Sequence, residues 1–175
     1  MTPAEESTSD SPLDSRSRSI ARLAGFGGAA ALVAATGSLA GRKSVRGWYR
    51  RLRKPPYQPP PEAFGPVWTL LYGAMAWSAW RVSRRPPSSA RTRALALWWT
   101  QLGLNGLWSP IFFGLRRPRI ALADLALMFA AISAYAAAAR KVDRPAAAAM
   151  APYLAWVAFA GLLNEEIVRR NPRRT

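Results

Sequence analysis

The sequence predicts an all-α integral membrane protein, a bundle of five transmembrane helices with a long proline-rich first loop. Half of its 175 residues are apolar, and they gather in blocks of roughly 20 residues that are nearly free of charge. At a rise of about 1.5 Å per residue, roughly 20 helical residues cross the hydrocarbon core of a bilayer, which is about 30 Å thick. Five such blocks can be delimited, at residues 20–40, 64–80, 94–114, 120–139 and 146–168.

The placement of the basic residues separates a membrane protein from other strongly basic proteins. The net charge is +16, from 25 Lys and Arg against 9 Asp and Glu. These basic residues flank the apolar blocks and do not form a stripe along one helix face, which argues against nucleic-acid binding. A soluble helical bundle stays open as an alternative, because residues 120–139 and 146–168 are rich in alanine and only mildly apolar.

Residues 1–19 are rich in Ser, Thr and acidic residues and have almost no large apolar side chains. Such a segment cannot bury enough surface to offset the entropy lost on ordering, so we expect a disordered polar tail. Residues 20–171 would then form the five-helix membrane domain, and residues 172–175 a basic C-terminal tail.

The first block, residues 20–40, has two interpretations. The arginines before it and Ser38-Leu39-Ala40 at its end resemble a signal peptide with a small-residue cleavage site. Its glycines favour a retained helix that another helix can approach closely. These glycines are Gly25, Gly27, Gly28 and Gly37.

The loop that follows, residues 42–63, is long for a connection between two spans. It contains Trp48-Tyr49 and then Lys54-Pro55-Pro56-Tyr57-Gln58-Pro59-Pro60-Pro61. Because proline fixes φ and removes a hydrogen-bond donor, this stretch is semi-rigid and non-helical. It could close over a cavity in the bundle as a lid, or serve only as a connector.

Polar and aromatic side chains inside the later blocks are the candidate functional residues, since hydrocarbon makes an unpaired polar group costly. In three blocks they recur at helical spacing and so share one face. They are Trp68 and Tyr72 in the second block, Gln101, Asn105 and Trp108 in the third, and Trp156, Ala160 and Asn164 in the fifth. Such faces either join helix to helix or line a pocket for a flat, largely apolar ligand with a few polar groups.

The remaining polar and aromatic residues of the blocks have structural explanations. Asp124, early in the fourth block, suits the membrane interface or the positive end of a helix dipole. Glu165 and Glu166 can pair with the arginines one helical turn later. Four tryptophans near block ends are expected as anchors at the headgroup level, and they are Trp77, Trp80, Trp98 and Trp99.

Five spans would place the two termini on opposite sides of the membrane. The side with the first loop and the C-terminus carries 14 Lys and Arg, against 11 on the other side. By a small margin, the positive-inside rule therefore favours a cytoplasmic first loop and C-terminus.

The chain has no Cys and no His. This excludes a disulfide framework, a thiolate nucleophile, an imidazole base and an ordinary structural zinc site. No obvious pair of carboxylates lies within the bundle to act as acid and base. We therefore expect a binding protein with no catalytic residue, no metal ligand and no obligatory cofactor.

Motifs spread along residues 20–171 resemble the TspO/MBR family, whose members are also called translocator proteins or tryptophan-rich sensory proteins. Their order and spacing match the family pattern. The first group comprises Trp48-Tyr49, Lys54-Pro55, Pro59-Pro60, Phe64-Gly65-Pro66-Val67-Trp68 and Leu71-Tyr72. The second comprises Gln101-Leu102, Leu104-Asn105, Trp108, Phe112-Phe113-Gly114, Pro152-Tyr153-Leu154, Trp156, Phe159-Ala160 and Leu163-Asn164.

The resemblance implies a five-helix membrane protein, usually a homodimer. It implies binding of porphyrins and haem, sterols and benzodiazepine-type ligands in a cavity closed by the first loop. Carried over by position, that cavity would be lined by Trp48, Tyr49, Trp68, Tyr72, Asn105, Trp108, Trp156, Ala160 and Asn164.

The chain departs from the family pattern at three places. Tyr57 stands where the family commonly has Trp, and Glu62 lies near a position that is often aromatic. No Tyr follows Asn164, which puts sterol binding through a cholesterol-recognition pattern in doubt.

The function expected from these features is a membrane receptor or sensor for porphyrin-type tetrapyrroles. Aromatic faces would stack on the macrocycle, and the amides of Asn105 and Asn164 would reach its polar substituents. Two alternatives stay open: transport of the ligand or its precursors, and light-dependent breakdown of bound porphyrin.

Overall fold

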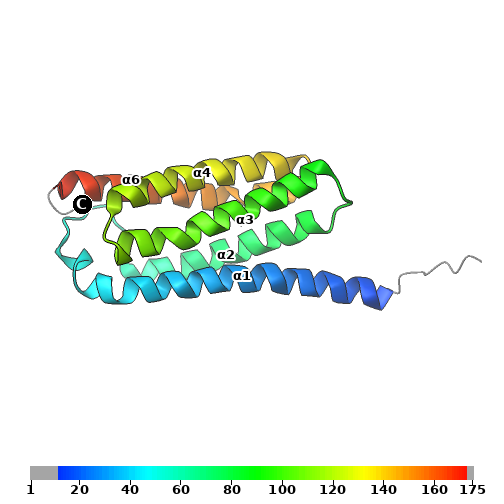
Figure 1. Cartoon of the computed structure of the whole chain (residues 1–175), viewed down its shortest axis with the longest axis horizontal. Coiled ribbons are helices and arrows are strands. Elements are labelled where there is room, and N and C mark those ends of the chain that lie inside the picture. Colours follow the sequence, from blue (N-terminus) through cyan, green and yellow to red (C-terminus); the bar gives the residue numbers. More distant parts are fainter. Residues whose placement is uncertain (1–11, 173–175) are drawn as a thin grey trace, which may run out of the picture.

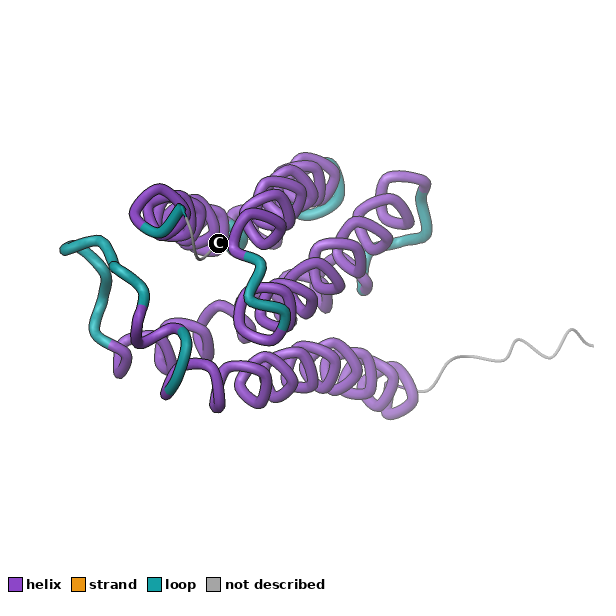
Figure 2. Tube along the Cα trace, turned by 60° about the vertical axis from the view of Figure 1, so that its left-hand side comes forward, coloured by secondary structure: helices purple, strands orange, loops and turns teal. Residues whose placement is uncertain are grey.

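The computed structural model describes residues 12–172, and all regular structure in this part of the chain is helical (Figure 2). Five long helices lie side by side along one direction (Figure 1). They are α1 (Pro12–Arg46), α2 (Pro61–Ser83), α3 (Ser89–Ser109), α4 (Pro118–Arg140) and α6 (Ala151–Arg170). The short elements are a 3-10 turn, η1 (Tyr49–Arg51), a π turn, η2 (Pro110–Gly114), and α5 (Arg144–Ala148).

The predicted all-helical bundle is confirmed, and local sequence explains where its helices begin. Proline stands in the first turn of α2, α4, α5 and α6, where its missing N–H has no intrahelical partner to lose. The Ser88 side chain accepts a hydrogen bond from the Arg91 N–H, which caps the start of α3. Each of the five apolar blocks overlaps one of the long helices.

Among the described residues, three helical segments are long and apolar enough to cross a membrane. They are Arg16–Leu39, Pro118–Arg140 and Arg144–Arg170. The helices α2 and α3 have similar lengths but are not among these segments. Large apolar side chains nevertheless point outward around the bundle, as expected for a surface that faces lipid, and they include Leu32, Leu70, Leu127 and Leu162.

Helix α1 begins earlier than the sequence predicts. Residues 12–19 are helical, whereas they were expected to belong to a disordered tail, and residues 1–11 of that tail lie outside the described residues. Contacts with α2 account for the extension: the Trp80 indole Nε1 donates to the Ser19 carbonyl at 3.0 Å. Farther along, α1 runs along one side of the bundle (Figure 2) and packs on α2 and α3.

The last apolar block is divided into two helices. A turn at Ala149 and Met150 separates α5 from α6, and Pro152 lies in the first turn of α6. Met150 is fully buried there, so the turn is part of the packed core.

The central core also corrects one sequence-based prediction. Trp98 was expected at the membrane interface, but it is 0% exposed and its Nε1 donates to the Met75 carbonyl at 3.0 Å. Because α3 begins at Ser89, Trp98 lies in its third turn and not at its end. The neighbouring Trp99 lies in the same turn of α3 and is 52% exposed on the outside of the bundle.

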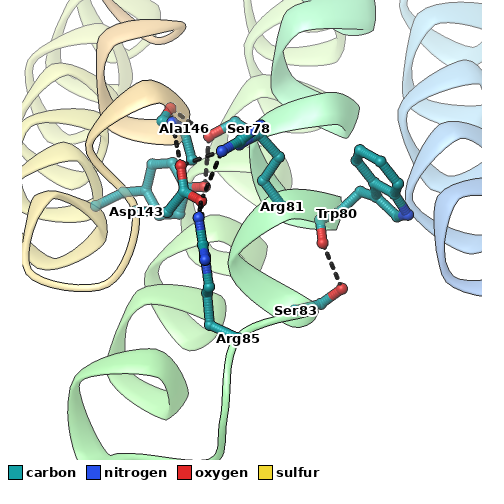
Figure 3. A network of polar contacts seen from close by, with 8 residues as sticks. Ser78, Trp80, Arg81, Ser83, Arg85, Asp143 and Ala146 are labelled. Atoms are coloured by element: carbon teal, nitrogen blue, oxygen red, sulfur yellow. Dashed lines mark hydrogen bonds and ion pairs between the residues drawn. The ribbon is translucent and has the colours of Figure 1, made fainter. Parts of the chain in front are cut away.

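A polar network joins the turn after α4 to the end of α2 (Figure 3). The buried Asp143 carboxylate accepts from the Arg81 Nε at 3.0 Å and from the Arg85 Nη2 at 2.6 Å, and it also accepts from the Ala146 N–H. Burial alone would raise the pKa of Asp143, but these hydrogen bonds outweigh it and lower the pKa to about 2. Nearby, Ser78 donates to the Ala146 carbonyl at 2.7 Å.

Candidate ligand cavity

A cavity of about 690 Å³ lies inside the bundle, in the half nearer the first loop. Five helices contribute to its walls: α1, α2, α3, α4 and α6, together with Phe113 of η2. Its lining is mostly aromatic and aliphatic, with a small number of hydroxyl and amide groups. This composition is typical of sites for small organic molecules.

Aromatic rings form the wall between α2 and α6. The Trp68 ring centroid lies 5.3 Å from that of Tyr72 and 6.5 Å from that of Trp156, and the two indoles are nearly perpendicular at 86°. Phe64 meets Trp156 at 5.7 Å, and Phe159 meets it at 5.8 Å. The wall thus presents ring faces and ring edges to the same space, which suits a flat aromatic ligand.

The polar part of the cavity is centred on Asn105, whose side chain is fixed by two tyrosines. Its Oδ1 accepts from the Tyr72 hydroxyl at 2.7 Å, and its Nδ2 donates to the Tyr153 hydroxyl at 2.9 Å. The Tyr153 hydroxyl in turn donates to the Met128 Sδ at 3.3 Å. Asn105 therefore joins α3 to α2 and α6, and it also lines the cavity.

Trp108 supplies an unused donor at the cavity wall. Its ring stacks on Phe112 at 5.0 Å with an interplanar angle of 21°, and its buried Nε1 has no partner within the described residues. A buried N–H that lacks an acceptor is unfavourable.

Six of the ten residues singled out from the sequence line this cavity. They are Trp68, Tyr72, Asn105, Trp108, Trp156 and Ala160. The other four do not line it: Trp48, Tyr49, Gln101 and Asn164.

Trp48 and Tyr49 pack at the end of the bundle, and not over the cavity. Their rings lie 5.9 Å from the ring of Phe112, and the Tyr49 hydroxyl donates to the Gln58 Oε1 at 3.1 Å. Burial raises the pKa of Tyr49. Tyr49 also packs on Phe113, which does line the cavity.

The first loop is tied to the end of α6. The Arg53 N–H donates to the Asn171 Oδ1, and the Asn171 Nδ2 donates to the Arg53 carbonyl, both at 2.9 Å. Leu52 is 5% exposed and packs with Phe112 and Ile167. The loop therefore packs over the end of the helices. It does not cover the cavity as a lid, which was one of the two expectations.

Asn164 turns away from the cavity because helical spacing does not return to the same angle, and Gln101 does not line the cavity either. At 3.6 residues per turn, eight residues from Trp156 to Asn164 rotate the side chain by about 80°. The Asn164 amide faces the beginning of α4. With its oxygen and nitrogen exchanged, its nitrogen donates to the Pro118 carbonyl and its oxygen accepts from the Leu122 N–H, both at 3.1 Å. Gln101 is 0% exposed, and both of its amide atoms lack partners within the described residues.

Helix α1 contributes cavity residues that sequence reasoning missed, among them Val33, Gly37 and Ser38. The one available signal was the glycine spacing. A Cβ at Gly37 would lie 3.2 Å from the Ser109 Oγ, so glycine permits the close approach of α1 to the end of α3. Gly25, Gly27 and Gly28 have open space around them, so the packing interpretation applies to Gly37 alone among these four.

The described residues contain no group of three His, Cys, Asp or Glu side chains that could hold a metal ion. The polar groups on the cavity wall are hydroxyls, amides and indole N–H groups, which bind by hydrogen bonding. This arrangement can stack its rings on an aromatic ligand and form hydrogen bonds with a few of the ligand's polar atoms.

Comparison with known proteins gives one consistent result. The TspO/MBR family model matches residues 26–170. A translocator protein of Bos taurus is 38% identical over 154 residues, which cover 82% of this chain and 91% of that protein. A translocator protein of Homo sapiens is 38% identical over 146 residues, covering 80% and 86%. A tryptophan-rich sensory protein of Cereibacter sphaeroides is 39% identical over 127 residues, covering 73% and 78%.

Proposed function

The chain belongs to the TspO/MBR family, and on this premise we propose that it is a membrane-embedded sensor that binds a porphyrin-type tetrapyrrole in its bundle cavity. The proposal rests on one observation: a single cavity combines an aromatic wall with a small polar centre. Relatives named translocator protein and tryptophan-rich sensory protein support a role in sensing or carrying a ligand.

The size and chemistry of the cavity support a flat ligand of this class. Its volume of about 690 Å³ lies within the range of about 300–1,000 Å³ that is usual for organic ligands. Trp68 and Trp156 would stack on or abut the macrocycle. The polar centre that Tyr72 and Asn105 form on the cavity wall would meet its polar substituents.

Recognition would depend on the macrocycle and not on a bound metal. The chain has no His or Cys to act as an axial ligand to iron. Two cavity side chains, Met128 and Tyr72, are of types that can bind haem iron, but both are already engaged. The Met128 Sδ accepts a hydrogen bond from Tyr153, and the Tyr72 hydroxyl donates to Asn105. Haem and iron-free porphyrin are therefore equivalent ligands in this proposal.

All five long helices would span the bilayer, α2 and α3 included, because they run beside the three segments that are apolar enough to do so (Figure 1). The first loop and the C-terminus then share one side of the membrane, and the cytoplasmic side is proposed for them on the excess of basic residues. A homodimer is proposed from family membership, and light scattering of the detergent complex would test it.

Titration with protoporphyrin IX tests the proposed site. Quenching of Trp fluorescence should saturate for the parent protein, and Ala160→Phe should weaken binding at least about tenfold, which is 1.4 kcal/mol, because the ring would occupy the cavity. Ala158→Phe is the matched control, since Ala158 is exposed on the same helix and does not line the cavity. Equal affinities for the two variants would place the ligand elsewhere.

Comparison of haem with protoporphyrin IX tests the absence of an iron ligand. The two dissociation constants should agree within about tenfold, because a protein–iron bond would stabilise haem binding by more than 1.4 kcal/mol. Met128→Leu should leave the absorption spectrum of bound haem unchanged. A spectral shift in that variant, together with much tighter binding of haem by the parent, would identify Met128 as an axial ligand.

A further inference from the structure

The wall of the ligand cavity is not closed all round. Most of its described lining residues are buried or half-buried, but Ser38, Gly65 and Thr69 line the cavity and are also exposed. Ser38 belongs to α1, and the other two belong to α2, which packs beside α1 (Figure 1). The exposed part of the described wall therefore lies along the boundary between these two helices.

Helical geometry explains why these residues reach that boundary. On α1, Gly37 points to the end of α3, where an added Cβ would meet a side chain at 3.2 Å, and Ser38 is turned about 100° farther around the helix. On α2, Phe64 contacts Trp156 of α6, and Gly65 is likewise turned about 100° away from that contact. Ser38 and Gly65 therefore both face the boundary between α1 and α2.

Small side chains border an opening at this boundary. Four of them line the cavity, two on each helix and one turn apart: Ala34 and Ser38 on α1, Gly65 and Thr69 on α2. Small residues at this spacing often let two helices approach closely. The helices stay apart here, because a Cβ at Gly65 would meet no neighbouring atom within 4 Å. We call the space between these four residues the α1–α2 opening.

Apolar surface surrounds the α1–α2 opening on the outside of the bundle. Leu39 follows Ser38 and is 61% exposed, and Leu70 follows Thr69 and is 74% exposed. Side chains of this kind face hydrocarbon in a membrane-spanning bundle. The opening therefore connects the cavity with the lipid phase.

The two hydroxyls at the opening form hydrogen bonds within their own helices. The Ser38 Oγ donates to the Ala34 carbonyl, and the Thr69 Oγ1 donates to the Gly65 carbonyl, both at 2.9 Å. A hydroxyl whose hydrogen is already bonded in this way can face an apolar environment at little cost. The rim of the opening thus suits the passage of an apolar or amphipathic molecule.

Two other routes into the cavity are blocked by packed side chains. Between α2 and α6, the Trp156 ring contacts Phe64 at 5.7 Å and Trp68 at 6.5 Å. At the end of the bundle, Tyr49 packs on Phe113 at 5.3 Å, and reciprocal hydrogen bonds tie the first loop to the end of α6. A ligand that used either route would have to separate these contacts, whereas the α1–α2 opening is bordered by small side chains.

We propose that the ligand enters and leaves the cavity from the bilayer, through the α1–α2 opening. The ligand is then a molecule that dissolves in the membrane, and its concentration in the lipid sets the rate of binding. This inference rests on the proposed function, because it takes the cavity as the binding site, and it adds the route and the phase from which the ligand comes.

Two glycines of α2 supply a matched pair of variants. Gly65→Phe places a ring in the opening, whereas Gly73→Phe adds the same ring at an exposed position that does not line the cavity. Stopped-flow quenching of Trp fluorescence by protoporphyrin IX, with the full-length protein in lipid nanodiscs, gives both rate constants. Gly65→Phe should slow association and dissociation by the same factor, at least about tenfold, with the dissociation constant within about threefold of the parent. Gly73→Phe should keep the rates of the parent.

Cross-linking compares the α1–α2 opening with the first loop. The chain has no cysteine, so introduced cysteine pairs react without background. Ser38→Cys with Thr69→Cys, joined by a short bis-maleimide, should slow exchange of protoporphyrin IX in both directions at least about tenfold relative to the unlinked protein. Arg53→Cys with Asn171→Cys, joined in the same way, should leave both rates unchanged, because the loop is already bound there. Mass spectrometry verifies each cross-link.

The proposed function and the route can fail separately. Saturable quenching of the parent at equilibrium tests the proposed function, and its absence would reject both. With binding intact, equal rates for Gly65→Phe and Gly73→Phe would overturn the route alone. Faster dissociation of Gly65→Phe at an unchanged association rate would also overturn it, because Gly65 would then contact the bound ligand. Exchange that is blocked by the loop cross-link and not by the cross-link across the opening would assign entry to the first loop.

Discussion

Replacing Asp143 with asparagine should lower the free energy of unfolding by about 3 kcal/mol, because two arginines would lose their buried partner. The carboxylate binds Arg81 and Arg85 from α2 and so holds the turn between α4 and α5 against the end of α2 (Figure 3). Asparagine can still accept the hydrogen bond from the Ala146 N–H, so the substitution removes the charge and keeps the cap of α5. Asp143→Ala should cost about 1 kcal/mol more, since it also removes the cap.

The pH dependence of stability gives an independent test of the same interaction. The pKa of Asp143 is lowered to about 2 in the folded protein, so folding favours its ionised form. The resulting stabilisation, roughly 2 kcal/mol, is complete above the ordinary carboxyl pKa of about 4 and is lost as the pH falls from about 4 to about 2. Asp143→Asn should lack this part of the pH profile.

Thermal unfolding in mild detergent between pH 2 and 6 would measure both effects. Glu166→Gln is the control, because Glu166 pairs with Arg169 and Arg170 at the surface of α6. Such exposed pairs contribute about 0.5 kcal/mol, so this variant should stay close to the parent. Parallel pH profiles for the parent and Asp143→Asn would contradict the role assigned to Asp143.

Sequence reasoning did not find Asp143, although its partners were visible as part of the basic flanks. The residue lies between Lys141 and Arg144 and looks like one charge of a membrane-flanking loop. Its partners, Arg81 and Arg85, lie about 60 residues earlier in the chain. Only the packing of α2 beside the turn after α4 brings them together, and no local pattern encodes that proximity.

The helices themselves were predictable because their signal is local. Apolar blocks of spanning length, prolines at helix starts and basic flanks all act within a few residues of one another. The angular position of a side chain is harder to predict over two turns or more. Trp68 and Tyr72, one turn apart, both reach the cavity, whereas Asn164, two turns after Trp156, faces α4.

The path of the first loop could not be predicted from the sequence either. Its prolines correctly indicate a semi-rigid, non-helical segment, and residues 52–60 contain no helix. Whether such a segment covers the cavity or the end of the helices depends on distant partners. Here the reciprocal amide contacts between Arg53 and Asn171 and the packing of Tyr49 on Phe112 hold it at the end of the bundle.

Replacing both Trp68 and Trp156 with alanine should weaken protoporphyrin binding more than about 100-fold. Stacking of a flat heterocycle on an aromatic side chain contributes about 1–3 kcal/mol per ring, so each single variant should lose about tenfold. The two indoles lie 6.5 Å apart at 86°, so one can meet the face of a macrocycle while the other meets its edge.

The double variant is informative because the two indole rings also pack against each other. Removing one indole frees its neighbour to move, so the combined loss need not equal the product of the single losses. Trp77→Ala with Trp99→Ala removes two indoles that are 38% and 52% exposed outside the cavity, and it should bind like the parent. That control also corrects the fluorescence signal for the number of tryptophans. If the cavity pair binds within threefold of this control, as measured by quenching or by the absorbance of the bound porphyrin, the aromatic wall between α2 and α6 is not the binding surface.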